Sequence, residues 1–172
     1  MQIRKSTEAD FEAILAIYNL AIPTKQITAD LTFATKENRR AWFDFHLTSE
    51  KYPIWTVEDE TGGAGWFSFS PFYERAAFAP TSEISIYLAE EAKGKGYGSK
   101  VIEFMQAEML NHGIHTLMAY VFELNEVSQT LMKKHGFAEW GRFLNIANMK
   151  QTEQEPDCWR TLLMMSYQKG IE

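Results

Sequence analysis

Polar and apolar side chains alternate through residues 83–88, near the middle of the chain. Their order is Glu83, Ile84, Ser85, Ile86, Tyr87 and Leu88. Successive side chains of a strand point to opposite faces of a sheet, so this alternation predicts a strand with one apolar face and one polar face. Glu83 is expected on the polar face.

Four helices are predicted elsewhere in the chain, three of them from their apolar faces. A capping-box pattern of Thr7 and Asp10 precedes the stripe Phe11, Ile14, Leu15 and Tyr18. A second helix is predicted after Thr35, with a buried face formed by Ala41, Trp42 and Phe45. A third helix follows Gly98 and ends at residues 112–113, burying Val101, Ile102, Met105 and Met109. A fourth covers residues 126–135 and stops at Gly136.

Six more strands complete the expected pattern, at residues 2–5, 52–59, 64–70, 115–122, 137–146 and 158–168. The sequence Thr61-Gly62-Gly63 predicts a turn that joins two of them into a hairpin. No internal repeat, low-complexity tract or linker interrupts the 172 residues. We therefore expect one α/β domain that spans residues 1–172.

Three glycines, Gly94, Gly96 and Gly98, lie between the central strand and the third helix. Such a bend lets backbone N–H groups converge beside the positive end of a helix dipole, which favours phosphate binding. Lys93 and Lys95 are expected to add positive charge. The order of residues after Gly98 excludes a P-loop, and the mid-chain position argues against a dinucleotide fingerprint.

The strand, the bend and a later motif occur together in an order typical of one superfamily. The segments are Glu83-Ile84-Ser85-Ile86-Tyr87-Leu88, then Lys93-Gly94-Lys95-Gly96-Tyr97-Gly98, then Asn125-Glu126-Val127-Ser128 with Leu131 and Gly136-Phe137. The chain closely resembles the Gcn5-related N-acetyltransferase (GNAT) superfamily, and within it the phosphinothricin and methionine sulfoximine acetyltransferase branch. The resemblance covers nearly the whole chain. It implies a mixed, mostly antiparallel central sheet flanked by helices.

The same resemblance implies acetyl-CoA as co-substrate, without a metal. The expected cofactor-binding residues are Ile86, Tyr87, Leu88, Lys93, Gly94, Lys95, Gly96, Tyr97, Gly98, Ser99, Asn125, Ser128 and Lys134. Three of these assignments have simpler alternatives. Asn125 and Ser128 also make good helix caps, and Lys134 also fits a solvated lysine.

Glu83 is the candidate catalytic residue. Acetylation requires a neutral amine, and a carboxylate on the polar face of the strand can take the ammonium proton directly or through water. In the resembled branch the matching glutamate is the proposed general base. The alternative is a solvated strand glutamate.

Substrate-binding residues are expected before the central strand, at Phe72, Arg75, Phe78 and Thr81. Arg75, Thr81 and Glu83 match an arginine-threonine-glutamate pattern of the resembled branch, and arginine can clamp a carboxylate or phosphinate. A surface arginine after an aromatic loop is an equal alternative. Residues 24–33 are expected to wall the same cleft.

Two departures from the resembled pattern concern the reaction and its acceptor. Many relatives carry His or Tyr where this chain has Met132, which cannot protonate a thiolate. Either water serves instead, or a group such as Tyr120 does. The segment 151–157 is longer than in relatives of the resembled branch, where it often borders the active site. The resemblance therefore does not specify which acceptor this chain uses.

Composition restricts the partners. The formal net charge is −6 and no basic stripe appears, so nucleic acid is not an expected partner. No apolar run approaches the roughly 20 residues that span a membrane, and no signal-peptide pattern is found. Cys158 is the single cysteine, which fits a reducing compartment, and the four histidines lack metal-ligand spacing. We expect a cytoplasmic protein, and by resemblance a homodimer.

The expected function is transfer of acetyl from acetyl-CoA to the primary amine of a small amino-acid-like molecule. Two alternatives remain at this point. One is an acetyltransferase for a polyamine or a protein N-terminus. The other is a CoA-binding regulatory module without turnover, which the residue at position 132 keeps open.

Overall fold

Seven strands form one sheet in the computed structural model, which describes residues 1–60 and 62–171. Their bounds are β1 (Gln2–Lys5), β2 (Ile54–Asp59), β3 (Gly62–Pro71), β4 (Thr81–Leu88), β5 (Thr116–Phe122), β6 (Ala138–Asn148) and β7 (Trp159–Gln168). The sheet order is β1-β2-β3-β4-β5-β7-β6. Among the described residues only β4 and β5 pair in parallel, and the other neighbouring pairs are antiparallel. The predicted α/β architecture and order of elements are confirmed.

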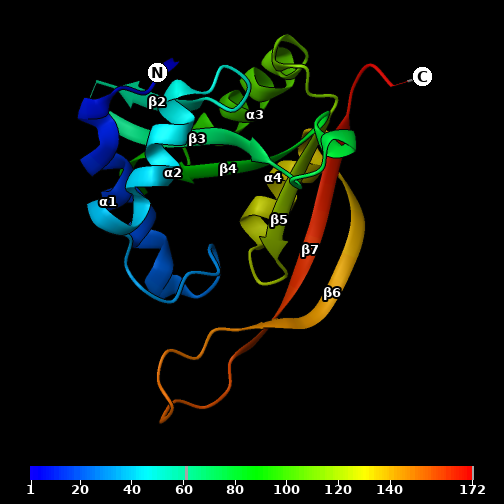
Figure 1. Ribbon diagram of the computed structural model, residues 1–172. Coiled ribbons are helices and arrows are strands. Elements are labelled where there is room, and N and C mark those ends of the chain that lie inside the picture. The colour runs from blue at the N-terminus through cyan, green and yellow to red at the C-terminus, as the bar shows by residue number, and fades with distance from the viewer. Residues whose placement is uncertain (61, 172) are drawn as a thin grey trace.

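Four α-helices in the described part of the chain cover the two faces of this sheet (Figure 1). They are α1 (Phe11–Ala21), α2 (Lys36–Thr48), α3 (Tyr97–Glu108) and α4 (Glu126–Lys134). One apolar cluster joins α1 and α2 to Ile54 and Trp66, and the larger one joins α3 to Phe67, Phe69 and Ile84. Trp66 and Phe67 are consecutive on β3, so the alternation of a strand separates the two clusters. None of the helices among the described residues is long and apolar enough to cross a membrane.

The hydrogen-bonded ladder between β4 and β5 is short. Only residues 81–83 of β4 pair with residues 116–118 of β5, whereas β3 pairs with β4 as far as Leu88. Beyond Glu83 the two parallel strands diverge (Figure 1). Within the described residues, one edge of β4 is therefore left without a neighbouring strand from Ile84 to Leu88, and its backbone groups on that side are available to a ligand.

The buried face of α2 differs from the sequence prediction. Ala41 and Phe45 are exposed, and the fully buried side chains are Phe43 and His46. The Phe43 ring stacks on Phe11 of α1, with centroids 4.2 Å apart, which turns this side of α2 inward. His46 donates from Nδ1 to the carbonyl of Tyr52 at 2.6 Å, so its burial leaves that nitrogen satisfied.

Several local predictions are confirmed. Thr7 and Asp10 form the expected capping box, and Gly113 and Gly136 end their helices at positive φ. The hairpin of β2 and β3 is present, although Thr61 of its turn lies outside the described residues.

Candidate active site

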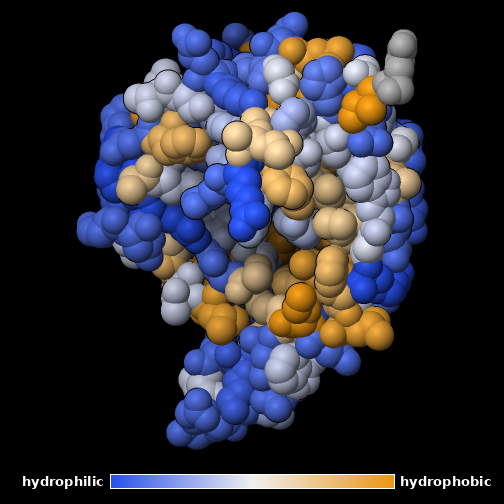
Figure 2. Space-filling model, turned by 45° about the vertical axis from the view of Figure 1, so that its right-hand side comes forward, coloured by the Kyte–Doolittle hydropathy of each residue, from blue (hydrophilic) through white to orange (hydrophobic). Residues whose placement is uncertain are grey.

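A cavity of about 380 Å³ lies on the α1 and α2 side of the sheet, where β4 and β5 diverge. Figure 2 shows a hollow in the surface above the projecting β6–β7 connection, with apolar side chains along its lower rim. The polar face of β4 forms the floor, through Glu83, Ser85 and Tyr87. Volumes of roughly 300–1,000 Å³ are typical of small-molecule sites. The cavity therefore suits a small ligand.

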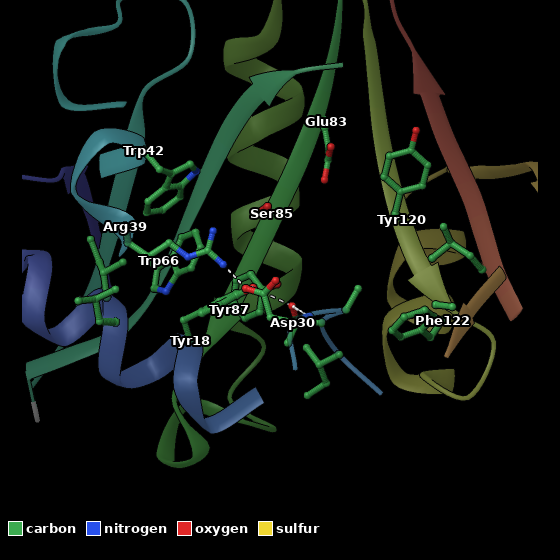
Figure 3. Close-up of a pocket in the computed structure, with 17 residues that line it drawn as sticks. Tyr18, Asp30, Arg39, Trp42, Trp66, Glu83, Ser85, Tyr87, Tyr120 and Phe122 are labelled. Carbon is green, nitrogen blue, oxygen red and sulfur yellow. Dashed lines mark hydrogen bonds and ion pairs between the residues drawn. The ribbon is translucent and has the colours of Figure 1, made fainter. Parts of the chain in front are cut away.

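Glu83 points into this cavity from the last residue of β4 that pairs with β5 (Figure 3). Burial raises the pKa of its carboxyl above the usual value. No residue that the structure describes forms a hydrogen bond or ion pair with this carboxylate. A carboxylate in this setting holds a proton more tightly than a solvated one, which suits a general base. The role of Glu83 as the general base stays a prediction.

Tyr120 faces Glu83 from β5, across the gap between the strands (Figure 3). Burial, and then the negative charge of Glu83, raise the pKa of its phenol. The hydroxyl is therefore protonated at neutral pH and can donate a proton or a hydrogen bond. Met132 is buried in the core, so it has no direct part in this cavity.

A hydrogen-bonded group on the wall opposite β4 joins α1, α2 and the loop between them. The Tyr18 hydroxyl donates to Asp30 at 2.6 Å and lies 2.7 Å from the Thr28 hydroxyl. Arg39 forms an ion pair with Asp30, and its guanidinium lies 5.4 Å from the centre of the Tyr18 ring. Burial, and then donation to Asp30, raise the pKa of Tyr18 to about 12. Residues 27–30 thus wall the cavity, as predicted for this loop.

Two tryptophans also border the cavity and were not predicted as site residues. Trp66 stacks on Tyr87 with centroids 4.7 Å apart, and Trp42 meets Trp66 edge-on at 5.6 Å. Both tryptophans line the cavity. From the sequence, each tryptophan is expected in the hydrophobic core. Neighbouring residues in the sequence do not show that one edge of its ring borders a cavity. Arg39 was missed for a similar reason, since it follows a charged run at the start of α2.

The glycine bend has the backbone shape that the sequence predicts. Gly94 and Gly96 have φ of 75° and 77°, and no atom within 4 Å would meet a Cβ at either. Gly96 caps α3 directly, so the N-terminal N–H groups of that helix open onto the bend. Lys93 pairs with Glu90, and Lys95 lies 3.2 Å from Asp59. Both lysine side chains are well exposed, at 56% and 40%, so these ion pairs are weak and leave positive charge beside the bend.

The remaining predicted cofactor residues lie on β4, in the first turn of α3 and at both ends of α4. Lys134 donates to the Ser99 hydroxyl at 3.3 Å, which joins the two helices. The Asn125 side chain accepts a hydrogen bond from the backbone N–H of Ser128 at 3.1 Å. Asn125 therefore caps α4, which is the alternative role considered for it in the sequence analysis. Ile86, Tyr87 and Leu88 lie along the open edge of β4. A role in cofactor binding stays a prediction for these residues.

The predicted substrate residues Phe72, Arg75, Phe78 and Thr81 do not line the cavity. Phe78 packs at 5.9 Å from Phe72 and at 5.4 Å from Tyr73. The Arg75 guanidinium lies 5.8 Å from the Tyr73 ring. These aromatic contacts hold the segment together before β4 begins, away from the cavity floor. A role in acceptor binding stays a prediction for these four residues.

No cluster of three or more His, Cys, Asp or Glu side chains within residues 1–60 and 62–171 is arranged to hold a metal ion. The polar groups that line the cavity are carboxylates, phenols, hydroxyls and one guanidinium, and the bend presents backbone N–H groups at the start of α3. Residues 1–138 match the family described as the Acetyltransferase (GNAT) domain. The chain belongs to the GNAT acetyltransferase family.

Individual GNAT relatives agree along nearly the whole chain. YwnH of Bacillus subtilis, named as a candidate phosphinothricin acetyltransferase, is 44% identical over 150 residues, covering 87% of this chain and 91% of its own length. An L-methionine sulfoximine/L-methionine sulfone acetyltransferase of Pseudomonas paraeruginosa is 30% identical over 164 residues, covering 95% of this chain and 91% of its own. Both are similar enough to support the family assignment independently.

One similar solved structure contains acetyl-CoA. The acetyltransferase yncA of Salmonella typhimurium, solved with its cofactor acetyl-CoA, matches with a TM-score of 0.87 at 26% identity, covering 100% of this chain and 95% of that chain. The GNAT fold expected from the sequence is confirmed. This protein is accordingly an N-acetyltransferase.

Proposed function

We propose that this enzyme transfers acetyl from acetyl-CoA to the primary amine of a small amino-acid-like acceptor, of the phosphinothricin or methionine sulfoximine type. The observation that carries the proposal is the half-buried carboxylate of Glu83, which has no ion-pair partner among the described residues and lies in the cavity beside the open edge of β4. The named activities of the two relatives above support the choice of acceptor. The size of the cavity agrees with a small molecule.

In this proposal Glu83 takes a proton from the acceptor ammonium, directly or through water, so that the nitrogen lone pair can attack the thioester carbonyl. Backbone N–H groups on the free edge of β4, within residues 86–88, stabilise the oxyanion of the tetrahedral intermediate. Tyr120 donates a proton to the departing thiolate, in place of the side chain that position 132 lacks. CoA thiolate leaves readily near neutral pH, because thiol pKa values lie around 8.5.

The cofactor would lie along the same edge. Residues 86–88 would hold the pantetheine arm, and the bend of residues 93–99 would hold the diphosphate on backbone N–H groups at the start of α3. Asn125, Ser128 and Lys134 would border the arm and the phosphates from α4. The open space above Gly94 and Gly96 supports this placement, since a side chain there would fill it.

A thiol-release assay with acetyl-CoA tests the proposal. The acceptors are phosphinothricin, methionine sulfoximine, methionine sulfone, the protein amino acids, two polyamines and short peptides. We expect turnover with the amino-acid-like acceptors and little with polyamines or peptides. Turnover confined to polyamines or peptide N-termini would overturn the choice of acceptor. Tight binding of acetyl-CoA in calorimetry, with no transfer to any amine, would instead support a regulatory module.

Gly96→Ala tests the proposed diphosphate site. Alanine at φ 77° costs roughly 1–2 kcal/mol of backbone strain, and its methyl group enters the space assigned to the diphosphate. We expect KM for acetyl-CoA to rise by about tenfold, which corresponds to about 1.4 kcal/mol of lost binding. Gly113→Ala is the matched control, because Gly113 also has positive φ, at 65°, with open space around it but lies at the other end of α3. Equal effects of both variants on KM would contradict the placement.

We also propose that two copies of the chain associate through β6. It is one of the two edge strands of the sheet, and its exposed apolar side chains are Trp140, Phe143, Leu144 and Ile146. An uncovered edge strand with apolar side chains is prone to pairing with another chain. Light scattering is expected to give the mass of two chains, and the mass of one chain would contradict the association.

A further inference from the structure

The connection between β6 and β7 contacts the loop that walls the acceptor side of the cavity. Residues 149–158 of this connection project from the sheet, and residues 25–31 form the loop after α1 (Figure 1). We infer that Gln151, Glu155 and Arg160 clamp both ends of loop 25–31 and thereby set the affinity for the acceptor amine. This inference rests on the proposed function, in which that cavity binds the acceptor.

Two contacts hold the first end of the loop at Lys25. Its ammonium lies 2.9 Å from Oε2 of Glu155, and Arg160 donates from Nε to its carbonyl at 2.9 Å. Lys25 has φ of 52°, a left-handed conformation that is uncommon for a residue other than glycine. Contacts from the β6–β7 end therefore stabilise a backbone geometry that the loop would adopt less readily alone.

Gln151 holds the other end. Its side-chain amide donates to the carbonyl of Leu31 at 2.9 Å, and its backbone N–H donates to Oε2 of Glu155 at 3.2 Å. The same carboxylate oxygen thus accepts from Lys25 and from Gln151. Glu155 therefore links the contact at one end of the loop to the contact at the other.

The residues between the two held ends form one wall of the cavity in which the acceptor is proposed to bind. Ile27, Thr28, Ala29 and Asp30 all line the cavity, and Asp30 holds Arg39 and Tyr18 in place. Residues 27–34, all of them described, belong to no helix or strand, so their position depends on contacts of this kind. Lys25 and Glu155 are only 25% and 35% exposed as side chains, which leaves their attraction partly shielded from water.

The clamp is separate from the proposed cofactor site. Gln151, Glu155 and Arg160 bond to loop 25–31 through Lys25 and Leu31. The side chains of the bend at residues 93–99 bond instead to Glu90, Asp59 and Lys134. Loss of the clamp should therefore weaken acceptor binding and leave binding of acetyl-CoA unchanged. This split distinguishes positioning of the loop from a general loss of folding.

Steady-state kinetics of Glu155→Ala and Glu153→Ala test the inference. Glu153 is a matched control two residues away, with a side chain 95% exposed and 3.7 Å from Lys150. We expect Glu155→Ala to raise KM for the acceptor by about fivefold, with kcat and KM for acetyl-CoA within about twofold of wild type. Lys25→Ala should act similarly, and the double variant should be no worse than either single variant. Equal acceptor KM in Glu155→Ala and Glu153→Ala would overturn the clamp.

Hydrogen exchange gives a readout that needs no turnover. Amides of residues 26–31 are expected to exchange faster in Glu155→Ala than in wild type or Glu153→Ala, with α3 unchanged. Unchanged exchange in this loop would reject the clamp even if the enzyme acetylates amino acids. Faster exchange in an enzyme that acetylates no amine would support the clamp and reject the proposed function.

Discussion

Glu83→Gln is expected to lower kcat/KM for the acceptor by at least about 100-fold at neutral pH, the lower end of what a general base contributes. Glutamine fills nearly the same volume and keeps a polar group on the floor of the cavity, but it cannot take the proton of the acceptor ammonium. KM for acetyl-CoA should change little, because Glu83 lies at the end of the paired part of β4 and not on its free edge. Thiol release measured across a range of pH is the assay.

The pH profile of this variant provides a sharper test. Burial raises the pKa of Glu83 above its ordinary value of 4.5. The base works only when it is ionised, so wild-type activity should rise as pH rises through this raised pKa. Glutamine does not titrate, and the variant should lack this limb. A variant with wild-type rates at all pH values would remove Glu83 from the mechanism.

Stability should change in the opposite direction from activity. A carboxyl with a raised pKa binds its proton more tightly in the folded state, so stability falls as pH rises from the unfolded pKa through the folded one. Glutamine stays neutral and avoids this loss. Above that window Glu83→Gln should therefore unfold at the same temperature as wild type or higher, which separates a catalytic defect from misfolding. A variant that is both inactive and clearly less stable would leave packing as the cause.

The sequence predicted the floor of the cavity because strand alternation is a local rule. Ile84 is buried and Glu83 faces the cavity, as the period of two requires. The glycine bend was predictable for a similar reason, since positive φ at Gly94 and Gly96 follows from residue type. These features depend on few long-range contacts.

The opposite wall depended on tertiary contacts that no local pattern contains. Arg39 and Trp42 reach the cavity because Phe43 stacks on Phe11, which fixes the rotation of α2 about its own axis. The predicted buried face of α2 was wrong at Ala41 and Phe45 for that reason, whereas Trp42 packs against the core as predicted. Asp30 contributes to this wall only because Tyr18 and Arg39 converge on it from two helices. Sequence spacing does not show that convergence.

The divergence of β4 and β5 could not be predicted from the sequence either. Both segments have the pattern of ordinary strands, and the parallel ladder between them ends at Glu83. A glycine on the neighbouring strand keeps the free edge of β4 in place. Gly65 of β3 pairs with Leu88, and a Cβ there would lie 2.6 Å from the Tyr87 carbonyl oxygen and 3.2 Å from the Leu88 Cα. Only glycine allows this approach of the two backbones.

Gly65→Ala is therefore expected to lower the free energy of unfolding by about 2 kcal/mol, as overpacking of a tight site does. The clash is with backbone atoms, so a change of side-chain rotamer cannot relieve it, and β4 must move away from β3. That movement displaces residues 87–88 on the proposed cofactor edge. KM for acetyl-CoA should rise by several-fold in consequence, in variant protein that is still folded at the assay temperature.

Gly63→Ala is the matched control for this prediction. Gly63 lies on the same strand, has no atom within 4 Å of the position that a Cβ would take, and lacks the positive φ that would strain alanine. Urea unfolding should place Gly63→Ala within about 0.5 kcal/mol of wild type, as for an ordinary surface substitution. Equal loss in the two variants would show that alanine in β3 is harmful for a general reason. A loss confined to Gly65→Ala, together with weaker binding of acetyl-CoA, would show that close packing of β3 on β4 holds the cofactor edge in its working position.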